Sequence, residues 1–259
     1  MRRVVPNTEY LRIMFVGRSG STKTRTAYSA CMDERMGRVL GLDMGGQPRS
    51  IRTYKPQPDI IGIESLPDLS RIYAWLKAKQ PRNDKIVSEF ELNPPYGTVV
   101  ADGWSEAQRL VVVSASGNSN TQLGDKPKPV EIQHYGTIFA QTTAILEGFY
   151  SLPMHVIGTA LENEREDNNT IAFRIQMVGQ SRDQAASYPE IVGRMMHIEK
   201  VSSQIRSALK HELTEDTVSV CFFKPSNKYE AKDQTGSLGE YMVDPTITKI
   251  LDAIELSGN

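Results

Sequence analysis

The chain has 259 residues, of which 39% are hydrophobic and 24% charged, and its formal net charge is -1 at pH 7. This length can bury a full hydrophobic core, and the neutral balance excludes a generic polyanion binder that acts through bulk charge. Two cysteines exclude a disulfide framework and a four-cysteine zinc site, so we expect a reducing, cytoplasmic environment. No apolar run approaches the roughly 20 residues of a membrane span, and the first residues are too polar for a signal-peptide core.

Apolar strands and amphipathic helices alternate along the first part of the chain. Short apolar runs predict strands at residues 11–16, 39–44, 98–102 and 154–160. Helical spacing predicts helices at residues 25–36, 68–79, 105–114 and 132–150, with Ser105 capping the third. Right-handed crossovers between such units give a mainly parallel sheet flanked by helices, so the predicted fold class is α/β.

The later strands are more closely spaced. We expect strands at residues 170–177, 192–199 and 218–223, and a closing helix at 244–256. Residues 117–130 lack apolar periodicity and predict a mobile loop, whereas the charged residues 162–169 predict a turn. The pattern favours a single domain at 11–256 with a hairpin-rich C-terminal edge, an extension at 1–10 and a tail at 257–259.

Residues 17–24 nearly match the phosphate-binding pattern G-x-x-x-x-G-K-[ST], and they lie between a buried strand and a helix as the pattern requires. Such a loop turns its N–H groups towards a phosphate, and the following helix adds positive potential. A Gly/Ser-rich turn with an incidental lysine is the competing interpretation. The residues predicted to bind ATP here are Gly17, Arg18, Ser19, Gly20, Ser21, Thr22, Lys23, Thr24 and Arg25.

Three positions carry the predicted chemistry of this loop. Lys23 would reach the β- and γ-phosphates, and the Thr24 hydroxyl would bind Mg²⁺. Thr22 stands where the pattern has its second glycine, and a β-branched residue tolerates a positive φ poorly. Gly20 supplies some of the backbone freedom that the loop needs.

A second carboxylate is expected to order the Mg²⁺ shell. Asp102 ends the apolar segment 98–102, and ligands of open α/β sheets gather at the carboxyl ends of the strands. An aspartate that only caps the next helix is the competing interpretation. The phosphate loop favours the metal role.

Five segments in this order resemble phage-type RecA-core P-loop ATPases, which are often described as AAA-family ATPases or nucleotide-binding proteins. The segments are residues 15–24, 39–43, 98–110, 152–160 and 231–236, and the likeness runs from about residue 11 to 256. The resemblance implies a RecA-like core that binds ATP and Mg²⁺ in a homo-oligomeric ring or filament, with ATP at subunit interfaces. Some members are linked to single-strand annealing and phage recombination, which implies single-stranded DNA as a partner and a phage-encoded protein in the cytoplasm of a bacterial or archaeal host.

The catalytic base does not follow the family pattern. Hydrolysis needs a carboxylate that polarises the attacking water. RecA-like enzymes place a glutamate just past the second strand, where this chain has Gly45. Asp43, at the predicted strand end, and Glu106, four residues after Asp102, are the remaining candidates. Together with Thr22, this departure leaves slow hydrolysis, or binding without efficient turnover, as an open alternative.

Two further site residues follow from the resemblance. Thr159 ends the fourth predicted strand, where RecA-like proteins carry a polar residue that senses the γ-phosphate; a strand-end threonine without a ligand fits equally well. Lys232 lies in a predicted loop and, by resemblance, reaches the phosphates of an adjacent subunit, where its charge would offset the charge that develops in phosphoryl transfer. A solvated surface loop is the alternative.

Signals for DNA are mixed. The loop at 117–130 carries Lys126 and Lys128, and residues 162–169 and 180–182 follow the fourth strand, where RecA-like proteins present DNA-binding loops. Acidic residues offset Arg165, so a solvated loop is at least as good an interpretation.

Three functions therefore remain open. The favoured one is a Mg-ATP-dependent ATPase that acts on single-stranded DNA. The alternatives are a nucleotide-dependent assembly module with weak or no hydrolysis, and an ATPase motor for duplex DNA or protein remodelling.

Overall fold

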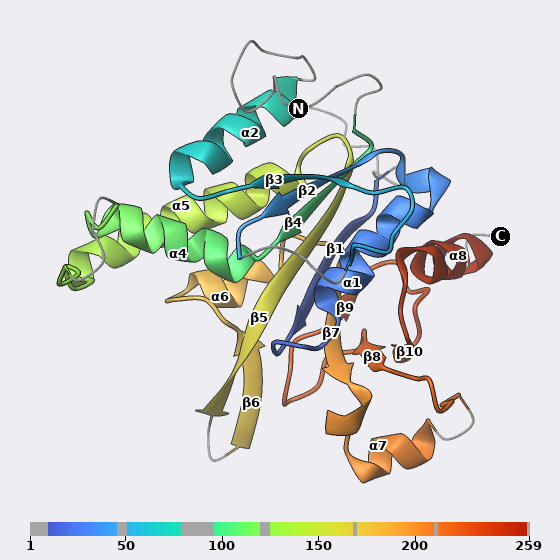
Figure 1. Cartoon of the computed structure of the whole chain (residues 1–259). Helices are drawn as coiled ribbons and strands as arrows, with labels where there is room; N and C mark the ends of the chain where they lie inside the picture. The colour runs from blue at the N-terminus through green and yellow to red at the C-terminus, as the bar shows by residue number, and fades with distance from the viewer. Residues whose placement is uncertain are drawn as a thin grey trace, which may run out of the picture.

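The computed structural model describes residues 10–45, 51–78, 96–119, 125–167, 170–209 and 212–257. A ten-stranded sheet forms its centre, with the main path β10-β8-β7-β1-β5-β4-β2-β3; β6 pairs with β5, and β9 pairs with β7 (Figure 1). The strands are β1 Arg12–Gly17, β2 Val39–Asp43, β3 Asp59–Gly62, β4 Thr98–Asp102, β5 His155–Asp167, β6 Thr170–Ile175, β7 Ile191–His197, β8 Ser219–Phe222, β9 Lys232–Asp233 and β10 Tyr241–Val243.

The six consecutive strands β7-β1-β5-β4-β2-β3 pair in parallel, and the pairs that involve β6, β8, β9 and β10 are antiparallel. The predicted α/β class, with a mainly parallel sheet and a hairpin-rich C-terminal edge, is therefore confirmed. Because parallel strands run in one direction, their carboxyl ends meet at one edge of the sheet.

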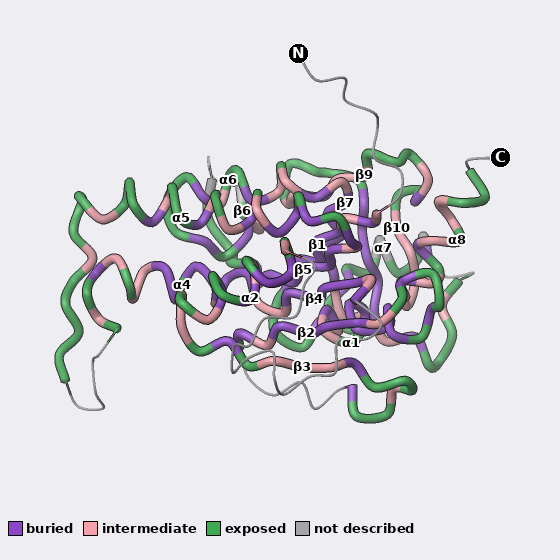
Figure 2. The backbone as a smooth tube through the Cα atoms, turned by 90° about the horizontal axis from the view of Figure 1, so that it is seen from above, coloured by how far each residue is buried: buried purple, intermediate pink, exposed green. Residues whose placement is uncertain are grey.

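Helices cover both faces of the sheet, so the parallel strands are buried on both sides. The helices are α1 Lys23–Tyr28, α2 Leu66–Ala78, α4 Trp104–Ala115, α5 Ile132–Tyr150, α6 Ser181–Ala185, α7 Ser203–Ala208 and α8 Ile247–Ser257. Met14 and Val16 belong to the core beneath α2, α4 and α5, whereas Ile13 and Phe15 belong to the core shared with α1 and α8. Figure 2 shows this buried centre between exposed helical surfaces.

Several boundaries differ from the sequence prediction. The helix expected at 25–36 ends at Tyr28 and continues as two 3-10 turns, Ser29–Met32 and Glu34–Met36, because Asp33 adopts an extended conformation between them. Ser105 does not cap α4: Gly103 holds that position, and the Ser105 hydroxyl accepts a hydrogen bond from the backbone N–H of Leu161 (3.0 Å).

The predicted turn at 162–169 is wrong for the residues that are described, because β5 continues to Asp167 and pairs with β6. Glu162 and Glu164 form ion pairs within the fold, which explains why charged residues extend a strand here. The short strand β3 was not expected, and Lys232 lies in β9 rather than in a loop.

The α4–α5 pair projects from one end of the molecule, and the described parts of the 117–130 segment lie at its tip (Figure 1). These described parts, residues 117–119 and 125–130, form no helix or strand, and the predicted mobility of the loop stays a prediction. The expected extension at 1–10 and tail at 257–259 fall almost wholly outside the described residues. No helix in the described ranges is long and apolar enough to cross a membrane.

Candidate functional site

The loop at residues 17–24, which the sequence predicts to bind phosphate and which we call the phosphate loop, begins where β1 ends, and its first residue must be glycine. A Cβ added to Gly17 would lie 2.4 Å from the carbonyl oxygen of Met195 on β7 and 2.7 Å from the Ser21 hydroxyl. Gly20 has a φ of 78°, a left-handed conformation that glycine adopts without strain. The loop is therefore fitted closely against β7 and turned by glycine.

Thr22 also adopts a left-handed conformation, with φ 67° and ψ 8°. As noted from the sequence, a β-branched residue tolerates a positive φ poorly. In this conformation such a residue is strained by about 1–3 kcal/mol. The Thr22 hydroxyl is buried and has no hydrogen-bond partner among the described residues. The loop thus carries strain at the position where the common pattern has glycine.

Lys23 is buried and folded back onto the loop. Its Nζ donates hydrogen bonds to the carbonyl oxygens of Gly17 and Arg18, both at 2.8 Å. Burial lowers the pKa of Lys23 from 10.5 to about 8, and the nearby Asp102 and Glu162 carboxylates act in the opposite direction. A cation is thus held at the centre of the loop with two carboxylates close by.

Hydroxyl groups from two elements converge on Asp102. Its Oδ1 accepts hydrogen bonds from Thr159 Oγ1 (2.6 Å) and from Thr24 Oγ1 (3.1 Å). Burial raises the pKa of Asp102, the two hydroxyls oppose that shift, and Asp43 adds to it. In the sheet register Asp43 lies beside Asp102 and Asp102 beside Thr159, so the three residues form one row across β2, β4 and β5.

A cavity of about 540 Å³ opens at this edge of the sheet and collects most of the predicted site. Of the predicted residues, Gly17, Arg18 and Lys232 are not among those that line it. Its lining also contains residues that the sequence did not single out. The lining residues are Ser19, Gly20, Ser21, Thr22, Lys23, Thr24, Arg25, Asp43, Gly45, Asp102, Gly103, Ser105, Glu106, Thr159, Ala160 and Leu161.

The two candidate bases differ in their surroundings. Oδ1 of Asp43 accepts a hydrogen bond from the backbone N–H of Gly45 (3.2 Å) and so holds the turn after β2. Glu106 lies in the first turn of α4, and a Cβ added to Gly45 would lie 3.6 Å from its Cγ. The Glu106 side chain therefore occupies the neighbourhood of the side chain that Gly45 lacks. Its carboxylate also pairs with Arg109 on the same helix.

Lys232 is not part of this site. In the sheet register it lies beside Val192, near the start of β7, whereas the phosphate loop follows the end of β1. Its Nζ donates a hydrogen bond to the carbonyl oxygen of Ser187 (3.2 Å). Any role for Lys232 at a phosphate therefore concerns another subunit.

The expected DNA-binding segments lie apart from one another. The described residues 125–130, which include Lys126 and Lys128, precede α5 at the tip of the α4–α5 pair, away from the β5–β6 hairpin (Figure 1). Within the hairpin Glu164 pairs with Arg18 of the phosphate loop, and in the described ranges Arg182 pairs with its neighbour Asp183. The described residues do not unite these segments into one basic surface.

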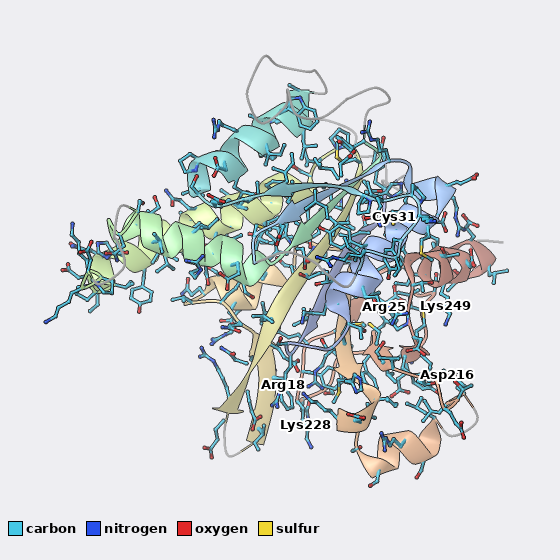
Figure 3. The ribbon with its side chains drawn as sticks, in the orientation of Figure 1. Arg18, Arg25, Cys31, Asp216, Lys228 and Lys249 are labelled. Carbon is cyan, nitrogen blue, oxygen red and sulfur yellow. The ribbon has the colours of Figure 1, made fainter. Side chains whose placement is uncertain are left out.

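A buried ion pair beside the loop was missed by the sequence analysis. Arg194 on β7 binds Glu162 on β5, and its guanidinium lies over the rings of Phe173 and Tyr229. Arg18 contacts the same Phe173 ring (5.3 Å) and, in Figure 3, lies on the side of the β5–β6 hairpin, whereas Arg25 lies nearer the C-terminal helix. No local pattern announces an interaction between residues 32 positions apart.

Neither a protein-family model nor a curated protein sequence matches this chain. Among solved structures, the chain is similar to one described as "The Structure Of A DnaB-Like Replicative Helicase And Its Interactions With Primase", with a TM-score of 0.44 and 9% sequence identity. The match covers 87% of this chain and 52% of that chain, so this chain spans about half the length of that relative. A likeness at this level assigns no activity to the chain.

Proposed function

We propose that this chain binds magnesium-ATP in the cavity at the carboxyl edge of the sheet and hydrolyses it as a RecA-like P-loop ATPase formed by residues 11–256. The observation that carries the proposal is the convergence of the Thr24 and Thr159 hydroxyls on Asp102, in a cavity that Lys23 also lines. A buried lysine within a glycine-containing loop suits phosphate, and the adjacent oxygen-only cluster suits a hard cation.

The residues present fit Mg²⁺. The Thr24 hydroxyl and the Asp102 carboxylate offer the hard oxygen ligands that Mg²⁺ prefers, and burial raises the pKa of Asp102, so a cation would relieve a carboxylate that is costly to keep charged. When bound, Mg²⁺ would neutralise phosphate charge. Thr159 would hold Asp102 in place from the neighbouring strand and contact the terminal phosphate.

Lys23 performs the first step of nucleotide binding in this proposal. Its Nζ exchanges the two loop carbonyls for phosphate oxygens, which are stronger, charged acceptors. The loop residues from Ser19 to Arg25 that line the cavity would surround the triphosphate. Gly17 and Arg18 act at the base of the loop, since neither lines the cavity.

Glu106 is the better candidate for the base that orients the attacking water. It lies next to the space that a side chain at Gly45 would take, whereas Asp43 is engaged by the turn after β2. A carboxylate in this position could accept a proton from water and polarise it. Arg109 would hold Glu106 in orientation from the next turn of α4.

The test is ATP binding and turnover in matched variants. Lys23→Ala should weaken magnesium-ATP binding at least about 100-fold in calorimetry, because it removes a buried charge-assisted contact. Glu106→Gln should leave binding nearly unchanged and lower turnover by about 100-fold or more, whereas Asp43→Asn should lower turnover less. Unchanged binding by Lys23→Ala would reject the site, and full turnover by Glu106→Gln would reject the base.

A second function is favoured by two specific observations. Thr22 stores strain in the loop, and Gly45 offers no carboxylate, and both features favour a nucleotide-dependent assembly module with little hydrolysis. In that case ATP promotes a larger assembly, while turnover stays near the uncatalysed rate. Light scattering with ATP, alongside a phosphate-release assay, separates the two functions.

The partner and the assembly form the finer part of the proposal. A homo-oligomeric ring or filament would place Lys232 against the nucleotide of an adjacent subunit, and single-stranded DNA in phage-type recombination is the proposed substrate. DNA-stimulated ATP turnover that is lost on Lys232→Ala, with unchanged ATP binding, supports this arrangement. Stimulation by duplex DNA or by a protein instead would favour a motor.

A further inference from the structure

Arg194 and Glu162 form a closed ion pair inside the protein. Arg194 donates from Nε (2.8 Å) and Nη2 (3.2 Å) to the two oxygens of Glu162, and the side chains are only 6% and 4% exposed. The rings of Phe173 and Tyr229 lie 4.2 and 4.6 Å from the guanidinium. A bidentate pair enclosed by two aromatic rings fixes both the charge and the orientation of the arginine.

This pair lies across the end of β1, where the phosphate loop begins. Glu162 follows Leu161, the register partner of Gly17, and Arg194 is the register partner of Val16. Both side chains line a small cavity of about 130 Å³ together with the first four residues that follow Gly17. The pair is therefore adjacent to the loop but is not among the residues that line the larger cavity.

The position of Glu162 poses an electrostatic problem for nucleotide binding. A triphosphate brings several negative charges to Lys23, and a buried carboxylate close to the same loop would repel them. The Lys23 ammonium group donates a hydrogen bond to the carbonyl oxygen of Gly17, and Gly17 lies beside Leu161, the residue that precedes Glu162. Arg194 supplies the opposite charge within hydrogen-bond distance, so the net charge of the pair is zero.

We propose that Arg194 is a positioning residue of the nucleotide site, which neutralises Glu162 so that Lys23 keeps its attraction for phosphate. The inference rests on the proposed nucleotide site and adds a residue to it that does not touch the ligand. Loss of Arg194 leaves an unpaired buried carboxylate beside the loop, whereas simultaneous loss of both charges does not. The pair thus predicts a rescue that a missing contact with the ligand would not give.

The experiment measures the dissociation constants of magnesium-ATP and magnesium-ADP for four variants in the full chain. Arg194→Gln should weaken ATP binding about tenfold or more, and ADP binding less, because ATP carries the additional charge. Arg194→Gln combined with Glu162→Gln should return to within about threefold of the unaltered protein. Arg194→Lys keeps the charge but not the bidentate geometry, so its loss should stay within a few-fold.

Arg12→Gln is the matched control. Arg12, the first residue of β1, pairs with Glu190 (3.3 Å), the residue before β7. This ion pair therefore links the same two strands, but at the end of β1 opposite to the phosphate loop. Its replacement removes an ion pair of the sheet without exposing a carboxylate beside the phosphate loop. We expect lower thermal stability with unchanged ATP and ADP affinities.

Equal losses for ATP and ADP, or a double variant that binds as poorly as Arg194→Gln, would show that the pair is only a structural link and would overturn the inference. If Arg194→Gln does not fold, the double variant decides: near-normal ATP affinity supports the inference, and a tenfold loss overturns it. An unaltered protein that does not bind ATP, or binding that survives Lys23→Ala, rejects the nucleotide site itself.

Discussion

Two carboxylates lie near Lys23, Asp102 at the end of β4 and Glu162 on β5, and their hydrogen-bond partners differ. Asp102 is held by two neutral hydroxyls, so its negative charge is not cancelled by a bonded partner. Glu162 is held by a guanidinium, so its charge is cancelled where it arises. A carboxylate bonded only to hydroxyls can attract a cation, whereas one paired with arginine cannot do so at little cost. Under the proposed function, Asp102 would bind the metal, and the Arg194–Glu162 pair would give the loop electrostatic support.

The largest expected effect is on catalysis at the hydroxyl-bound carboxylate. Asp102→Asn keeps the shape and removes the charge, so magnesium-ATP turnover should fall about 100-fold or more, with a weaker dependence on Mg²⁺ concentration. Glu162→Gln should change turnover by less than about tenfold, because that charge is already cancelled. Steady-state rates over a Mg²⁺ titration test both, and equal losses would remove the distinction between the two carboxylates.

For the unfolding free energy, we expect the change at Glu162 to have a larger effect than the change at Asp102. Glu162→Ala leaves the Arg194 charge buried without its partner, which costs about 3–5 kcal/mol of unfolding free energy. Asp102→Asn should change the unfolding free energy by less than about 1 kcal/mol without ligand, since burial raises the pKa of Asp102 and its charge is not stabilising there. Denaturant titrations at pH 7 give both values, and a larger loss for Asp102→Asn would contradict the assignment.

The pH dependence of stability at Lys23 compares the same two carboxylates, Asp102 and Glu162. Burial lowers its pKa to about 8 from 10.5, so between these values the unfolded chain binds a proton that the folded chain does not. Its contribution to the unfolding free energy therefore rises with pH across that window, by about 3 kcal/mol. Lys23→Met should remove this rise in denaturant titrations at pH 8 and pH 10. Asp102→Asn should widen the window more than Glu162→Gln, since Asp102 has the larger effect on the lysine.

The smallest expected effect concerns the backbone strain at Thr22 in the phosphate loop. Thr22→Gly should raise the unfolding free energy by about 1 kcal/mol, because glycine tolerates a φ of 67° and the unpaired buried hydroxyl is removed. Thr22→Ala is the control, since it removes the hydroxyl and keeps the backbone strain. A thermal-unfolding series that finds Thr22→Gly less stable than Thr22→Ala would show that the threonine is not strained.

Local sequence was a good guide where a segment carried its own pattern. The 19-residue helix α5 and the strand β4 have the predicted bounds, because apolar spacing determines them without distant partners. Thr24, Asp102 and Thr159 were each predicted to serve one ligand site, and the structure brings their side chains together. The chemical roles of these residues remain predictions.

Interactions between strands that are distant along the chain could not be predicted from local sequence patterns. Glu162 lies in a charged stretch that is typical of a turn, and its partner Arg194 comes from a strand on the far side of β1, so only the strand order joins them. The short strand β3 carries just four residues after a proline-containing turn, too few for a periodic signal. The preference for Glu106 over Asp43 likewise needed the position of Gly45 relative to α4.

Strand β5 runs for 13 residues, about 40 Å, first inside the parallel sheet and then along β6 in a two-stranded ribbon. The backbone N–H groups in these two parts of β5 therefore differ in how much of the protein must open before they exchange. Val156 to Ala160 should exchange their amide hydrogens only through global opening, whereas exposed Asn163 and Arg165 should exchange through local fraying of the ribbon. The residue at which the protection changes marks how far the rigidity of the core extends beyond the phosphate loop.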